Sequence, residues 1–71
     1  MRYAVIVEKG ESSFGAYVPD LPGCAAVAET IEEVLRLIQE AIEFHLEGLV
    51  KDGQALPEPS SIVEYVEVKA A

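Results

Sequence analysis

The sequence predicts an α+β fold of two layers, in which a mixed four-stranded sheet carries one long helix on one face. Three observations predict it: short apolar segments separated by turns containing Gly or Pro, one long segment of helical periodicity, and a last alternating segment after a Pro-rich connector. A length of 71 residues and a hydrophobic content of 51% suit one small domain with a core. We therefore expect a single domain over residues 1–71.

The first two strands are predicted to form a hairpin. From Arg2 to Lys9, apolar residues fall on both faces of an extended chain, which is typical of a central strand. The polar segment Gly10–Ser13 separates it from a second strand-like segment, Phe14–Val18. Four residues between two strands suit a tight connection, so the two strands should be antiparallel.

A sharp turn is predicted after the second strand. Pro22 and Gly23 are the residue types preferred at the two central positions of a type II turn, because proline presets the first φ and glycine accepts a positive second φ. The chain should reverse there, and the segment from Cys24 to Ala28 should form a short third strand.

A helix is predicted from Ile31 to the region of Asp52 and Gly53. Thr30 and Glu33 have the spacing of a capping box, and glycine at position 53 suits the left-handed residue that closes a helix. One apolar stripe appears when residues are placed at about 100° steps, and it is predicted to face the core: Ile31, Val34, Leu35, Ile38, Ile42 and Leu49.

The connector Leu56–Ser60 is Pro-rich and stiff, and the segment from Ile62 to Val68 is predicted to be the last strand. A helix between two strands usually makes a right-handed crossover to a parallel neighbour. The last strand is therefore expected beside the first, which gives the sheet order 3-2-1-4. One helix covers only one face of such a sheet, so a second subunit is expected to cover the other.

Self-association is also expected from the size of the chain, because so short a chain obtains only about 3–5 kcal/mol from its own core. Leu37 and Phe44 are seven residues apart on a flank of the predicted helix, outside its core stripe. We interpret these two residues as a candidate contact between copies in a homo-oligomer.

Composition excludes several functional classes. The chain has 5 basic and 13 acidic residues and a net charge of −8, and its basic residues are scattered, unlike those of a nucleic-acid binder. One cysteine and one histidine cannot build a disulfide framework or a zinc cluster. No apolar run approaches the roughly 18 residues of a membrane span, and no secretion signal is recognised. We expect a cytoplasmic protein without a cofactor.

Two arrangements of reactive side chains are weighed against structural roles. Asp20, Cys24 and His45 have the residue types of a nucleophilic triad, but their spacing does not indicate one, so we favour packing roles for them.

Glutamates on strands that could be neighbours offer a metal-binding alternative: Glu8, Glu64 and Glu67. Thirteen acidic residues in so short a chain make such coincidences common, and a solvated surface is favoured. The functional alternative left open is a stand-alone homo-oligomer that binds a small molecule, or a residual metal-dependent hydrolase.

The charged side of the helix is a candidate surface for a basic protein partner, because complementary charge guides association and selects partners. Arg36 and Lys51 are expected to pair with the acidic residues four positions before them. The candidate partner-facing residues are Glu32, Glu40, Glu43 and Glu47.

At Tyr17–Cys24, followed by Ala28–Val34 and Glu40–Ile42, the chain resembles the HicB antitoxin family. The shared pattern is D-L-P-G-C, a short strand, T-x-E-E and a helix of E-A-I type. The resemblance covers residues 1 to about 68. Four residues carry the family motif, and we interpret their role as building the turn and packing the third strand: Asp20, Pro22, Gly23 and Cys24.

The resemblance implies a truncated ribonuclease H fold without its catalytic carboxylates, assembled into dimers or tetramers and without enzymatic activity. It also implies a partner, the small basic toxin HicA, which cleaves mRNA and whose catalytic histidine the antitoxin blocks. The expected function is therefore neutralisation of a HicA-type toxin by occlusion of its active site. Many relatives continue into a DNA-binding segment, whereas this chain ends at Ala71, so direct DNA binding is not expected.

Overall fold

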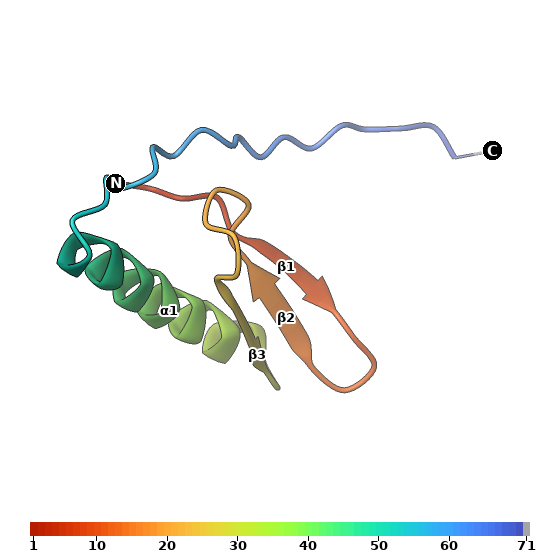
Figure 1. Cartoon of the computed structure of the whole chain (residues 1–71). Coiled ribbons are helices and arrows are strands. Elements are labelled where there is room, and N and C mark those ends of the chain that lie inside the picture. The colour runs from red at the N-terminus through yellow and green to blue at the C-terminus, as the bar shows by residue number, and fades with distance from the viewer. Residues whose placement is uncertain (71) are drawn as a thin grey trace.

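The computed structural model describes residues 1–70 and confirms the α+β class. Three strands and one helix follow one another along the chain: β1 (Ile6–Lys9), β2 (Phe14–Tyr17), β3 (Ala25–Ala28) and α1 (Ile31–Lys51). The strands form one antiparallel sheet in the order β1-β2-β3, and α1 covers one face of it (Figure 1). The molecule therefore has two layers, a helix on a sheet.

The first two strands form the predicted hairpin. Val7 lies opposite Ala16 on β2, and Ala16 in turn lies opposite Ala26 on β3. Inside the connection between β1 and β2, the Gly10 N–H donates to the carbonyl oxygen of Ser13 at 2.7 Å. Because β2 has a partner on each side, it is the central strand. β1 was expected to be central and is instead an edge strand.

The core lies between α1 and the face of the sheet that α1 covers. Small side chains on β2 and β3 allow α1 to pack closely, and α1 contacts these two strands more than β1. The residues of the core are Ala16, Val18, Leu21, Cys24, Ala28, Val34 and Ile38.

The predicted core stripe of the helix is only partly buried. Val34 and Ile38 are fully enclosed, whereas Ile31 and Leu35 are 49% and 44% exposed. Leu35 lies on the side of α1 toward the start of the chain, beyond the β2 and β3 contacts. Its exposure has a physical reason: among residues 1–70 no fourth strand extends the sheet under that side of the helix.

Both ends of α1 have the capping signals that the sequence predicts. At the start, the Thr30 hydroxyl accepts a hydrogen bond from the Glu33 N–H at 3.1 Å. At the end, Gly53 has a φ of +71° and the Gln54 N–H donates to the Leu49 carbonyl at 2.9 Å, which is the pattern of a Schellman motif. The predicted helix boundaries are confirmed.

The predicted fourth strand and the sheet order 3-2-1-4 are wrong for the described residues. The sheet has three strands, and residues 62–68, here called the C-terminal segment, pair with none of them. Figure 1 shows this segment passing over one end of the sheet and continuing away from the body. Residues 57–61, which precede this segment, make contacts, described below, that hold the chain at the end of the sheet. The C-terminal segment therefore does not run along β1.

Within residues 1–70, the structure contains no helix with the length and hydrophobicity of a membrane span.

Candidate functional site

The family-like motif builds the turn between β2 and β3. The Cys24 N–H donates to the Leu21 carbonyl at 3.0 Å and Gly23 has a φ of +85°, the geometry of a type II turn with Pro22 and Gly23 at its centre. The Leu21 side chain is fully buried and Cys24 is 4% exposed. The turn therefore inserts two of its side chains into the core.

Asp20, in the same turn, binds a distant part of the chain. Its Oδ2 accepts hydrogen bonds from the backbone N–H groups of Ser60 and Ser61, both at 2.9 Å. Its Oδ1 accepts from the two serine hydroxyls, at 3.2 Å and 2.8 Å. These bonds, of which that from the Ser61 N–H has the largest effect, hold the pKa of the Asp20 carboxyl below its ordinary value of 3.8.

A second contact holds the same region of the chain. The Tyr3 hydroxyl donates to the Pro57 carbonyl at 2.5 Å. Tyr3 and Asp20 together fix residues 57–61 against the end of the sheet. Sequence reasoning missed both anchors because each joins positions at least 40 residues apart, which no local spacing can reveal.

The residues of the nucleophilic alternative have other surroundings. Cys24 is buried, and its burial raises the pKa of the thiol, which disfavours the reactive thiolate. The Asp20 carboxylate is occupied by Ser60 and Ser61, and His45 is half-buried on α1. No hydrogen bond between Asp20, Cys24 and His45 is present in the described part of the chain.

The metal-binding alternative lacks its predicted geometry. It needed the last strand beside the first, but Glu64 and Glu67 lie on the C-terminal segment, outside the sheet that contains Glu8. Among residues 1–70, no group of three or more His, Cys, Asp and Glu side chains is placed to hold a metal ion.

The acidic helix surface, defined as Glu32, Glu40, Glu43 and Glu47, is exposed along α1. Arg36 pairs with Glu40 at 2.8 Å, whereas pairing with Glu32 was expected. Lys51 pairs with Glu47 at 3.4 Å, as expected. Within residues 1–70, Glu32 and Glu43 have no ion-pair partner, so these two carboxylates are the uncompensated charges of the surface.

The candidate contact between copies, Leu37 and Phe44, lies on α1. Phe44 is 79% exposed, while Leu37 is partly buried against the core. A large aromatic side chain that is so exposed is typical of contact surfaces. The role of this pair stays a prediction.

An apolar groove of about 530 Å³ runs between the start of the chain and α1. Sequence reasoning missed it, since its two walls, the start of the chain and α1, lie far apart in the sequence and meet only in the folded molecule. Its apolar lining comes from the first residues and from one side of the helix: Met1, Tyr3, Val5, Leu35, Ile38, Ile42 and Leu46. Gln39 and Glu43 complete the lining.

Comparison with known proteins identifies one family. Residues 3–70 match the family described as "HicB_like antitoxin of bacterial toxin-antitoxin system". A solved chain of a "HicA3 and HicB3 toxin-antitoxin complex" superposes with a TM-score of 0.71 at 30% sequence identity, covering 84% of this chain and 70% of the other.

Two relatives match nearly the whole chain. An uncharacterized 14.9 kDa protein of Haemophilus phage HP1 is 36% identical over 93% of this chain and 50% of its own length. Antitoxin HicB 2 of Photorhabdus laumondii is 33% identical over 100% of this chain and 52% of its own length. This chain therefore spans about half the length of these two relatives.

Proposed function

This chain belongs to the HicB-like antitoxin family, and on that premise we propose that it neutralises a small basic toxin of HicA type by covering the toxin's active site. The observation that carries the proposal is the family match over residues 3–70, which includes the complete β1-β2-β3-α1 unit. The superposition on a chain from a toxin–antitoxin complex supports it.

The acidic helix surface is the proposed contact for the toxin. The net charge of −8 attracts a basic protein from a distance, and the unpaired carboxylates of Glu32 and Glu43 offer it direct ion pairs. Because these side chains are exposed, forming the pairs costs little desolvation. We therefore expect charge to set the rate and selectivity of binding more than its final strength.

Occlusion requires no chemistry from this chain. Its only thiol is buried with a raised pKa, and the Asp20 carboxylate is held by hydrogen bonds to two serines. The proposed activity is therefore binding alone, by a non-enzymatic homo-oligomer in the cytoplasm.

Charge reversal on α1 tests the proposed contact. The double variant Glu32→Lys with Glu43→Lys should bind a small basic toxin of HicA type at least about tenfold more weakly, a loss of about 1.4 kcal/mol, with most of the change in the association rate. Surface plasmon resonance at several salt concentrations measures both rates.

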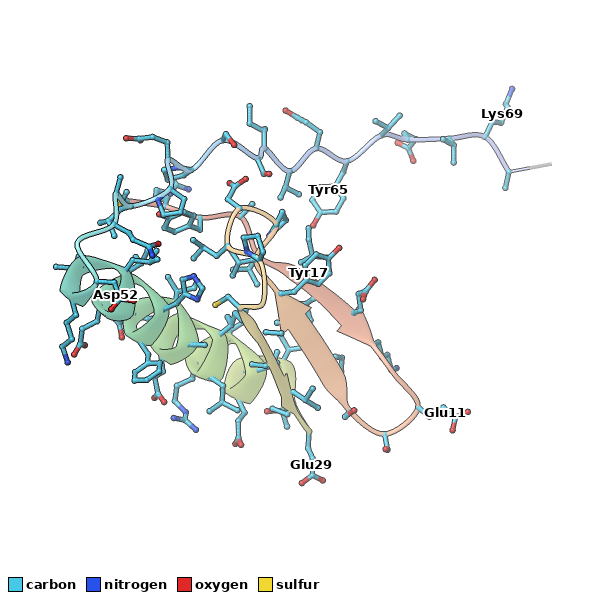
Figure 2. All side chains as sticks on the ribbon, in the orientation of Figure 1. Glu11, Tyr17, Glu29, Asp52, Tyr65 and Lys69 are labelled. Carbon is cyan, nitrogen blue, oxygen red and sulfur yellow. The ribbon has the colours of Figure 1, made fainter. Side chains whose placement is uncertain are left out.

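A matched control separates a specific surface from overall charge. The variant Glu11→Lys with Glu58→Lys makes the same change in net charge at exposed positions outside α1, and Figure 2 shows Glu11 at the hairpin tip. It should lose much less affinity than the α1 variant. Equal losses would reject the acidic helix surface, and absence of any binding at low salt would reject the proposed function.

A further inference from the structure

The C-terminal segment has the composition of a strand but no strand partner. Its residues are mainly β-branched or aromatic, the types favoured in sheets. Ile62, Tyr65, Val66 and Val68 are 82%, 94%, 80% and 78% exposed. Exposed apolar side chains along an extended, unpaired backbone are the mark of a segment that pairs with another chain.

The same molecule carries a free sheet edge. β1 pairs with β2 on one side only, so the N–H and C=O groups on its outer side are unpaired within the described sheet. The apolar groove lies beside the start of the chain that leads into β1. A strand added along this edge would gain backbone hydrogen bonds, and its inward side chains would enter the groove under α1.

The anchors direct the C-terminal segment away from its own β1. Asp20 accepts hydrogen bonds from Ser60 and Ser61, and Tyr3 donates one to Pro57. Ile62 and Val63 still line a pocket with residues 2–4 of the same chain, and beyond them the segment diverges from β1 (Figure 1). Figure 2 shows Lys69, near its end, far from the sheet and α1. The radius of gyration is 14.2 Å, compared with about 11 Å for a compact chain of this length. The projecting segment can therefore reach a second molecule.

The local charges along the free edge favour a second copy of this chain as the acceptor, although the net charge of −8 opposes close approach of two copies. The strip leading into and through β1 has a basic residue at each end, Arg2 and Lys9, and one acidic residue, Glu8, while the C-terminal segment carries Glu64 and Glu67. Two copies related by a two-fold axis can satisfy each other, because each offers one strand and one edge. No third protein is needed to supply a pairing partner for the C-terminal segment or for the free edge of β1.

We propose that residues 62–68 are an exchanged strand, which pairs with the free edge of β1 in a second copy and fills that copy's apolar groove. The two copies exchange these segments reciprocally. The exchange completes a four-stranded sheet in each half of the dimer, with the fourth strand supplied by the partner. Glu43 belongs to the acidic helix surface and also lines the apolar groove, so the two proposals share one residue. The exchange is therefore tested without any toxin.

A charge placed in the segment tests the exchange. Val66→Asp puts a carboxylate where an apolar contact is proposed, and because Val66 is 80% exposed in the single chain the fold should survive, as circular dichroism can check. Analytical ultracentrifugation should give the wild type at least the mass of a dimer and the variant at most half the wild-type mass. Gln54→Glu, which makes the same charge change at an exposed site, should keep the wild-type mass.

Two local readouts identify the strand and its acceptor. Hydrogen exchange should find the amides of residues 62–68 protected in the wild type and unprotected in Val66→Asp. In a mixture, a spin label on Val66→Cys should broaden the β1 amide signals of an isotope-labelled wild-type copy; Cys24 is buried and should not take the label.

Four results would overturn the proposal. They are a wild type that is monomeric at all concentrations, a Val66→Asp variant of unchanged mass, protection of residues 62–68 in a monomer, and protection that appears only when a toxin is added. The third result would assign the segment to its own chain, and the fourth to the toxin. No toxin is used in the first three measurements, so failure of the proposed function leaves them interpretable.

Discussion

The residues of the turn between β2 and β3 have two separate structural roles. Gly23 and its neighbours reverse the chain and seal the core, since Leu21 and Cys24 are buried. Asp20 faces outward and holds Ser60 and Ser61. The same short motif thus links the turn between β2 and β3 to the chain that leads into the C-terminal segment.

The backbone of Gly23 provides a prediction with a matched control. An added Cβ would meet no atom within 4 Å at Gly23 or at Gly48, so steric contact does not distinguish the two sites. They differ in backbone conformation, because only Gly23 has a positive φ. Gly23→Ala should destabilise the fold by about 1–2 kcal/mol because of its positive φ. Gly48→Ala, within α1, should stabilise it by about 0.5–1 kcal/mol. Chemical denaturation measures both, and equal effects would contradict the conformational explanation.

The Asp20 anchor should depend on pH in a defined direction. The folded pKa of Asp20 lies below 3.8, so the ionised carboxylate favours the anchored state. The anchor's contribution is fully present above the ordinary pKa and is lost as pH falls through the lower folded pKa. The amide resonances of Ser60 and Ser61 should report this loss below pH 3.8, and Asp20→Asn should remove the transition. A titration midpoint above 3.8 would contradict the anchor.

At the scale of elements, α1 has several sides with different surroundings. Val34 and Ile38 face the core, Leu35 and Ile42 line the apolar groove, and Phe44 is exposed on a flank. The acidic helix surface adds a further side. Besides supporting the fold, this helix is therefore the proposed site of the exchanged strand, of the contact between copies and of toxin binding.

Phe44 provides a test of the candidate contact between copies on the flank of α1. If the Leu37 and Phe44 contact joins two strand-exchanged dimers, Phe44→Glu should reduce a tetramer to a dimer while helix content is unchanged, because Phe44 is 79% exposed. Protection of residues 62–68 should persist in this variant. Val50→Glu, at a 61% exposed site of the same helix, is the control. An unchanged elution volume for Phe44→Glu would reject the flank contact.

The elements that the sequence predicts correctly depend on neighbours in the chain. Thr30, Gly53 and the Pro22–Gly23 pair act on the backbone within a few residues, so their effects can be read locally. The segment from Ile62 to Val68 also has a strand pattern, but a pattern cannot specify which edge it pairs with. The contacts of Asp20 with Ser60 and Ser61 depend on the folded path of the chain, and no spacing predicts them.

At the scale of the whole molecule, the small core and the charge imbalance both point to binding partners. Among residues 1–70 the core consists of seven buried residues, so additional stability from a second copy is expected. The net charge of −8 favours a basic partner and opposes close approach of like surfaces. Copies would therefore need apolar contacts, for which the exchanged strand and Phe44 are proposed, whereas the acidic helix surface is proposed for the toxin.

The most direct measurement is RNA cleavage by a small basic toxin of HicA type, taken from any small basic reading frame adjacent to that of this chain and titrated with the purified chain. The proposed function predicts that cleavage falls to zero at a fixed molar ratio, that a stable complex forms at that ratio, and that rising salt slows its formation. Undiminished cleavage in the presence of excess chain at low salt would contradict the role of this molecule as an antitoxin.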